Sequence, residues 1–348
     1  MKKFVRLLII SLLALATAFS LFACSGANGK TEEKGIIAKK LSGDNFYTVI
    51  GYGAEDGVDT LDVASAAKQK YGEQIVVGRI RTGAFDGNTT LTEIILSDSA
   101  ADDIDLTIDA GAFKNMRALK KITLPFVGAN AYSDAYYNET EPAKGDELKA
   151  TDKERLFGYI FGEEESEYSA AITQFYGDTS EETATFYIPA TLREITVSAA
   201  SEINIPMYAF YGISGITTVN LNGEIKAIGQ AAFKNAVGLK KINIPASVKV
   251  IYENAFEGAE SIRTFTIDSG STLTAIKDNA FKGTKLTAFD ISGTQVKEIG
   301  NYAFYNSSLT SFIFSEGIET IGAYAFANCK NLTVNAPDCT IGVNAFAK

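Results

Sequence analysis

The chain has 348 residues, of which 32 are basic and 42 acidic, so its net charge is −10 at pH 7, and it contains neither histidine nor tryptophan. The lack of histidine excludes Ser-His-Asp and Cys-His nucleophilic sites, histidine general bases and zinc sites built on histidine. The acidic balance argues against a nucleic-acid partner, because phosphate binding needs an excess of Lys and Arg.

Residues 1–23 predict an export signal. Lys2, Lys3 and Arg6 surround the start of a long apolar run, which is typical of a signal peptide. An uncleaved membrane anchor is the alternative, since the run 7–23 is near the shortest length that spans a bilayer. Residues 21–24 (Leu-Phe-Ala-Cys) resemble the lipobox of bacterial lipoproteins, which implies that Cys24 is lipidated. Either way, we expect the N-terminus to hold the chain at a membrane.

Residues 24–35 are small, polar and charged, and predict a flexible tether. Residues 36–72 then predict an N-terminal α/β cap, with a strand over 46–50 and a helix over 61–71 that begins at a Thr60 cap and ends at Gly72. A second strand is predicted over 75–77. The glycines of 51–57 favour a turn over a nucleotide loop, because Glu55 and Asp56 would repel a pyrophosphate.

One pattern then recurs to the end of the chain. Its clearest copy, residues 239–256, has apolar residues at 239, 242, 244, 248 and 251 and closes with Ala255-Phe256. The closing Phe recurs at 85, 113, 210, 233, 256, 281, 304, 326 and 346. A period of about 23 residues predicts a solenoid, whose units bury their apolar faces only by stacking on one another. The alternation of Ile242 and Ile244 predicts a strand with one face inward.

The pattern L-x-x-I-x-I-P-x-x-V-x-x-I-x-x-x-A-F resembles the BspA-type leucine-rich repeat of bacterial surface proteins, over about residues 73 to 346. This resemblance implies a leucine-rich-repeat solenoid, α/β but mostly β, wound as a right-handed curved coil with a parallel sheet on its concave side. It also implies a surface location and a role in adhesion or in binding host or partner proteins. We expect irregular repeats over 73–125 and regular ones over 188–348.

Residues 126–187 interrupt the repeat with an acidic segment rich in tyrosine. We expect a modified repeat or insertion, in which residues 156–161 pack on the solenoid and residues 162–169 are mobile. The acidic run 163–167 could be imagined as a glycosidase carboxylate pair or a calcium site. Solvated charge is the favoured interpretation, because neighbouring glutamates on a loop usually face water.

Two cysteines follow the predicted lipid site. Cys329 and Cys339 are too few for a disulfide framework, and we expect two buried free thiols rather than a disulfide.

The sequence predicts a non-enzymatic surface binding or adhesion protein, anchored by lipid on the outer face of the bacterial membrane. Its protein partner is expected to bind the concave face. Outward strand positions there carry polar side chains: Thr218, Asn220, Lys241, Asn243, Thr264 and Thr266. A carbohydrate-binding envelope lipoprotein and a structural spacer without a specific ligand are the alternatives. No catalytic residue, cofactor, metal or nucleic acid is expected.

Overall fold

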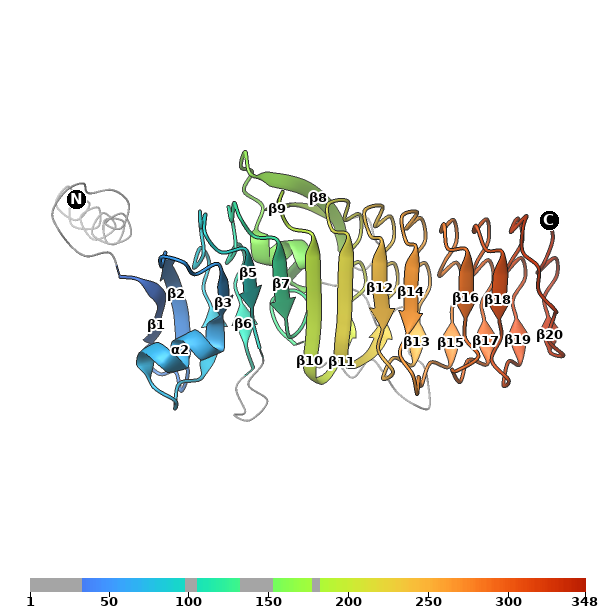
Figure 1. The fold of residues 1–348 in the computed structure, drawn as a ribbon, viewed down its shortest axis with the longest axis horizontal. Coiled ribbons are helices and arrows are strands. Elements are labelled where there is room, and N and C mark those ends of the chain that lie inside the picture. The colour runs from blue at the N-terminus through green and yellow to red at the C-terminus, as the bar shows by residue number, and fades with distance from the viewer. Residues whose placement is uncertain (1–32, 98–104, 132–152, 177–181) are drawn as a thin grey trace, which may run out of the picture. The chain divides into compact units, whose positions relative to one another are not determined.

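The computed structural model describes residues 33–97, 105–131, 153–176 and 182–348 (Figure 1). Residues Lys34–Lys348 form one compact unit. This unit is a mostly-β parallel solenoid of about ten turns with little helix, which confirms the predicted fold class. The export signal, Cys24 and the tether up to residue 32 lie outside the described residues.

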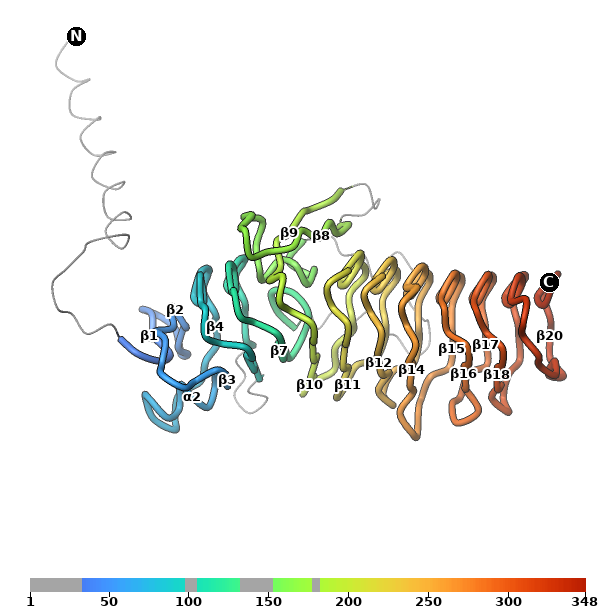
Figure 2. The backbone as a smooth tube through the Cα atoms, turned by 45° about the horizontal axis from the view of Figure 1, so that its top comes forward, coloured from blue at the N-terminus to red at the C-terminus, as the bar shows by residue number. Residues whose placement is uncertain are grey.

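Most turns contribute two short strands, which stack into two rows (Figures 1 and 2). We call row A the strands β3 (Thr60–Asp62), β5 (Glu93–Ile95), β7 (Lys121–Leu124), the first halves of β10 (Glu194–Ile205) and β11 (Thr218–Ile228), β12 (Lys241–Ile244), β14 (Thr264–Ile267), β16 (Ala288–Asp290) and β18 (Ser311–Ile313). Row B contains β2 (Tyr47–Gly53), β4 (Val77–Ile80), β6 (Thr107–Ile108), the second halves of β10 and β11, β13 (Val250–Ile251), β15 (Ala275–Ile276), β17 (Glu298–Ile299), β19 (Thr320–Ile321) and β20 (Thr340–Ile341). Pairing within each row is parallel, and β10 and β11 run through both rows. At the N-terminal end β1 (Gly35–Lys40) pairs antiparallel with β2.

The core lies between the rows and follows the predicted register. Ile242, Ile244 and Phe256 are completely buried, so the apolar positions of the repeat point inward as expected. The described apolar side chains of successive turns form one continuous cluster, because each turn covers the apolar face of the next.

The closing Phe residues form a stack along the solenoid. From Phe210 to Phe346, neighbouring rings lie 5.0–5.2 Å apart between centroids and are nearly parallel, at 2–14°. Main-chain hydrogen bonds join the same positions of successive turns: Phe233 N donates to Ala255 O and Phe256 N donates to Ala280 O, each at 2.7 Å. An alanine precedes the Phe because the turns meet there through their backbones.

Each closing Phe from Phe85 to Phe326 also lies between two residues of left-handed backbone. Around Phe256 these are Asn254 (φ 57°) and Gly258 (φ 71°), two positions before and after the ring. Glycine and asparagine adopt this conformation most readily, and they hold most of the equivalent positions in other turns. Tyr302 and Tyr324 occupy it as well, with φ of 56°.

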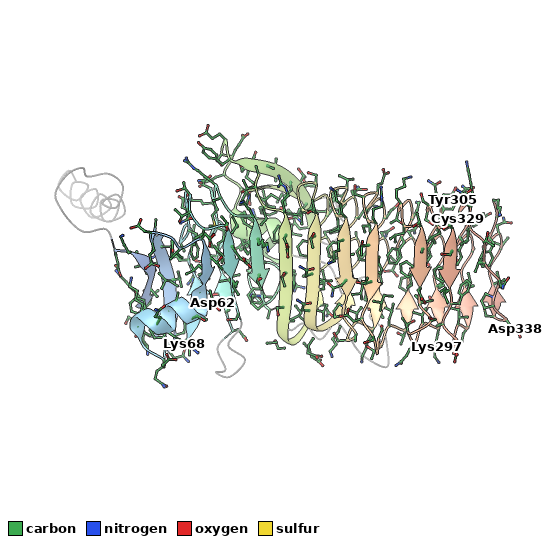
Figure 3. All side chains as sticks on the ribbon, in the orientation of Figure 1. Asp62, Lys68, Lys297, Tyr305, Cys329 and Asp338 are labelled. Atoms are coloured by element: carbon green, nitrogen blue, oxygen red, sulfur yellow. The ribbon has the colours of Figure 1, made fainter. Side chains whose placement is uncertain are left out.

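The N-terminal region differs from its prediction in detail. The helix α2 (Val63–Tyr71) is capped by Asp62, labelled in Figure 3, whose side chain accepts from Ser65 N at 2.9 Å. The predicted Thr60 cap is therefore wrong, because Thr60 lies in β3, which pairs with β5. Gly72 ends the helix as predicted. The second strand is Val77–Ile80 rather than 75–77, and β2 extends through the first two glycines of the predicted turn.

The described residues of the interruption form one extra turn and a hairpin. The 3-10 helices η1 (Lys153–Arg155) and η2 (Phe157–Phe161) enter the stack, as Phe113 N donates to Ile160 O and Phe157 N to Ala209 O, both at 3.0 Å. The antiparallel strands β8 (Ser169–Tyr176) and β9 (Glu182–Pro189) follow. Gln174, fully buried, fixes β8 to the solenoid: it accepts from Gly158 N at 2.9 Å and donates to Ala209 O at 2.8 Å.

Both described cysteines are free. Cys329 is buried near Tyr305 (Figure 3) and donates to Phe304 O at 3.1 Å, and burial raises the pKa of its thiol. Cys339 is only half-buried, so its predicted burial is wrong. The turn that carries it is covered on one side only, since β20 pairs with β19 alone among the described strands.

A ladder of charges follows the turns beside the Phe stack. Glu257 accepts from Lys234 at 2.8 Å and lies 3.2 Å from Lys282, so one carboxylate joins three turns. Burial raises the pKa of Glu257, but the hydrogen bonds and charges of the two lysines outweigh it and hold the pKa below the ordinary value of a glutamate.

This ladder predicts a pH-dependent stability. Because the folded-state pKa of Glu257 is depressed, its stabilisation is present above the unfolded pKa and is lost as the pH falls through the folded pKa. We expect Glu257→Gln to lower the urea midpoint at about pH 7 and to lower it progressively less below about pH 4.5. The exposed Glu316→Gln serves as control. An equal deficit for Glu257→Gln at about pH 7 and about pH 3 would contradict the ladder.

Candidate binding face

The six predicted binding residues lie on the outward face of row A. Thr218, Lys241 and Thr264 are direct neighbours across β11, β12 and β14, and Asn243 pairs with Thr266. All six are exposed or half-exposed, whereas Val219, Leu221 and Ile242 beside them are completely buried. The strand period thus brings the predicted side chains together on one surface, which we call the row A face.

Charges of alternating sign lie along this face. The register position of Thr218 continues through Glu194, Lys121 and Glu93 on the preceding strands. Lys121 Nζ lies 3.9 Å from Glu194 Oε2. Exposed pairs of this kind contribute little to stability, typically less than about 1 kcal/mol. Their side chains therefore stay available for charged groups on a partner.

The two asparagines differ in what their amides do. Asn220 donates to Glu194 Oε1 at 3.1 Å and to Thr196 Oγ1 at 3.4 Å, both on the surface. Asn243 Oδ1 instead accepts from Leu221 N at 2.9 Å, and its Nδ2 donates to Leu221 O at 2.7 Å. Asn243 therefore joins β12 to β11 where the main-chain pairing has ended, and its amide is not free for a ligand.

A cleft that the repeat pattern did not predict opens within the row A face. It has a volume of about 390 Å³ and lies between β14 and β16. Its lining consists of Phe265, Thr266, Ile267, Asp268, Ser269, Asp290, Ser292, Gly293 and Thr294. Thr266 is the one predicted binding residue in this lining. The feature of the sequence that indicates this cleft is the change of loop length after β14.

The acidic run of the insertion is neutralised in part by lysines. Glu163 pairs with Lys153 at 2.6 Å, and Glu164 pairs with Lys114 at 2.9 Å. These pairs raise the pKa of both lysines, chiefly through the hydrogen bonds to the carboxylates. In the part of the chain that the structure describes, no group of three or more acidic or cysteine side chains is placed to hold a metal ion.

The tyrosines of the insertion present little open ring surface where they are described. Tyr159, Tyr168, Tyr176 and Tyr187 are all half-buried. The ring of Tyr168 is covered by Arg117, whose Cζ lies 3.9 Å from the ring centroid. An exposed tyrosine ring occurs elsewhere, at Tyr302, which stacks on Tyr324 with centroids 5.0 Å apart.

The stacked parallel turns and their polar outward face define a leucine-rich-repeat solenoid. The BspA type leucine rich repeat region matches residues 74–142, 179–307 and 297–348 in six copies, which together make up more than half of the chain. The chain therefore belongs to the BspA-type leucine-rich repeat family. Members of this family are often surface or adhesion proteins, and they are generally non-enzymatic.

Solved bacterial leucine-rich repeat proteins are similar to this chain. The leucine rich repeat protein of T. pallidum is 24% identical, with a TM-score of 0.41, over 53% of this chain and 87% of its own. A leucine rich cell surface protein of Faecalibacterium prausnitzii A2-165 is 18% identical, with a TM-score of 0.32, over 93% of this chain and 75% of its own. The curated proteins give no match. No helix within the described residues has the length and apolar character to cross a membrane.

The contrast between the two asparagines can be tested by stability. We expect Asn243→Ala to cost about 1–3 kcal/mol, because the substitution leaves the main-chain N–H and C=O of Leu221 without their partner. Asn220→Ala is the matched control and should cost less than about 1 kcal/mol, since its partners face solvent. Urea unfolding of the two variants measures the difference. Equal losses would show that Asn243 is an ordinary surface residue.

Proposed function

We propose that this protein is a non-enzymatic surface binding protein that holds a protein partner on its row A face. In this proposal the export signal 1–23 and lipid on Cys24 place the solenoid on the outer side of the bacterial membrane. Residues 1–32 lie outside the described part, so the anchor rests on the sequence alone.

One observation carries the proposal: polar side chains of successive turns meet in register on one face. Repeat solenoids bind through extended surfaces of this kind. On the row A face, Glu93, Lys121, Glu194 and Lys241 present both signs of charge in a fixed order. A partner whose charges alternate in the complementary order would bind more specifically and associate faster, because complementary charges act mainly on specificity and on the association rate.

The partner is proposed to be a protein rather than a sugar. A carbohydrate site would use the aromatic rings of the acidic, tyrosine-rich insertion, and its four described tyrosines are half-buried. The row A face carries Thr, Asn, Lys and Glu side chains spread over successive turns, and such a surface suits many dispersed contacts. Adhesion to host proteins is one form that this function would take.

A charge reversal tests the proposal. We expect Lys241→Glu combined with Thr264→Ala to lower by tenfold or more the amount of partner that the immobilised chain captures from host-matrix and envelope proteins, because the reversal breaks the order of charges. Lys285→Glu is the matched control: Lys285 is exposed in a turn outside row A and the charge change per lysine is the same. Capture that is unchanged in the row A variant would remove this face from the function.

A further inference from the structure

Row A is interrupted once in its regular part, between β14 and β16. In the sheets as described, β14 pairs only with β12, and β16 pairs only with β18. Row B continues past the same point without a break, through β13, β15 and β17. Figure 1 shows β14 and β16 more widely spaced than β12 and β14 or β16 and β18.

Changes in loop length accompany this interruption. The next buried strand-start residue, Ile262, lies six positions beyond Phe256, whereas Leu286 lies only five positions beyond Phe281. The loop that follows β14 is longer than the loop that follows β12, because Leu273 is six positions beyond Ile267 and Val248 is four positions beyond Ile244. The path of the chain through row A therefore changes at this step while row B keeps its spacing.

The interruption leaves main-chain groups of two strands facing the cleft. Thr264 N and Asp268 N donate to Lys240 O and Ile244 O of the β12 turn. Since main-chain groups alternate in direction along a strand, those of Phe265 and Ile267 point to the other edge, toward β16. Directly after β16, Ile291 N donates to Ile313 O on the β18 side, so the groups of Ala288 and Asp290 point toward β14.

The side chains around these edges are acidic and hydroxylic. Asp268 and Asp290 stand on the two sides of the cleft, with Thr266, Ser269, Ser292 and Thr294 between or beside them. Asp290 Oδ1 accepts from Ser292 N at 2.8 Å and Ser292 Oγ at 2.7 Å, which fixes its carboxylate. Below the cleft the core stays closed, because Phe265 and Phe289 stack at 5.1 Å.

We propose that this cleft binds an extended peptide segment with lysine or arginine side chains, which adds as a strand to the free edge of β14. The proposal deepens the proposed function and rests on it, since it assigns the row A partner a point of attachment. An edge with unpaired N–H and C=O groups is a template for strand addition. A peptide supplies donors and acceptors at the strand repeat, and its alternate side chains reach Asp268 and Asp290.

The probe for a test is a fluorescein-labelled peptide, Thr-Lys-Thr-Lys-Thr-Lys-Thr, titrated with the folded chain while anisotropy is recorded at low salt. We expect saturable binding, and a dissociation constant at least about tenfold higher for the double variant Asp268→Asn, Asp290→Asn. The control double variant Glu316→Gln, Asp338→Asn removes the same charge from exposed positions elsewhere, and it should bind as the parent chain does.

A second peptide separates strand addition from simple charge attraction. The same sequence with N-methyl groups on alternate residues keeps its charges but loses half of its main-chain donors, and we expect it to bind at least about tenfold more weakly. Equal binding of the methylated peptide, an equal effect of the two double variants, or displacement of the peptide by the neutral sugar cellohexaose would each overturn the proposal. If the cleft fails to bind the peptide but capture of a partner still depends on Lys241, only the cleft proposal falls. The proposed function then remains intact.

Discussion

The contact between successive closing phenylalanines is the interaction on which the rest of the structure depends. From Phe210 to Phe326 each ring stacks on the ring of the next turn, and the N–H of the Phe bonds to the alanine carbonyl of that turn, as in Phe233 to Ala255 and Phe256 to Ala280. A single turn has no partner for its ring or for its N–H and is unstable alone. The two strand rows, the row A face and the charge ladder at Glu257 all follow from the stacking, because it sets the spacing of equivalent residues.

The repeat pattern predicted the fold and the inward residues because a period is a property of the chain itself. Ile242, Ile244 and Phe256 were assigned to the core from spacing alone, and they are buried. The prediction failed where the outcome depends on contacts between different turns. Threonine is a residue type that often caps helices, but Thr60 pairs with β5 as part of a strand, and Asp62 caps the helix instead. Asn243 has a polar outward side chain that suits ligand binding. Its amide instead bonds to Leu221, because the main-chain pairing of β11 and β12 has ended there. The extra turn Phe157–Phe161 lacks the Ala-Phe pair, yet it is buried in the stack, as the sequence predicted for residues 156–161.

Identical turns produce a uniform surface, and a uniform surface cannot by itself select one partner. Selectivity must then come from places where the repeat changes. In this chain the described changes include the hairpin of β8 and β9, which Gln174 fixes to the stack, and the interruption between β14 and β16. The row A face is broken at that interruption, so a polar surface of regular spacing leads directly to a cleft with free strand edges. In leucine-rich-repeat solenoids the stack supplies rigidity, while loop lengths decide where a ligand finds an opening.

The most direct measurement of the central claim is amide hydrogen exchange of Phe256→Ala, compared with the exposed Val237→Ala. Truncation of a buried Phe typically costs about 3–5 kcal/mol, and in a stack held by neighbour contacts that loss is felt first by adjacent turns. The account predicts faster exchange at Phe233 and in the turn of Phe281, with the effect declining along the chain and almost absent at Phe85. Unchanged exchange in the adjacent turns, or an equal loss of protection throughout Lys34–Lys348, would contradict it.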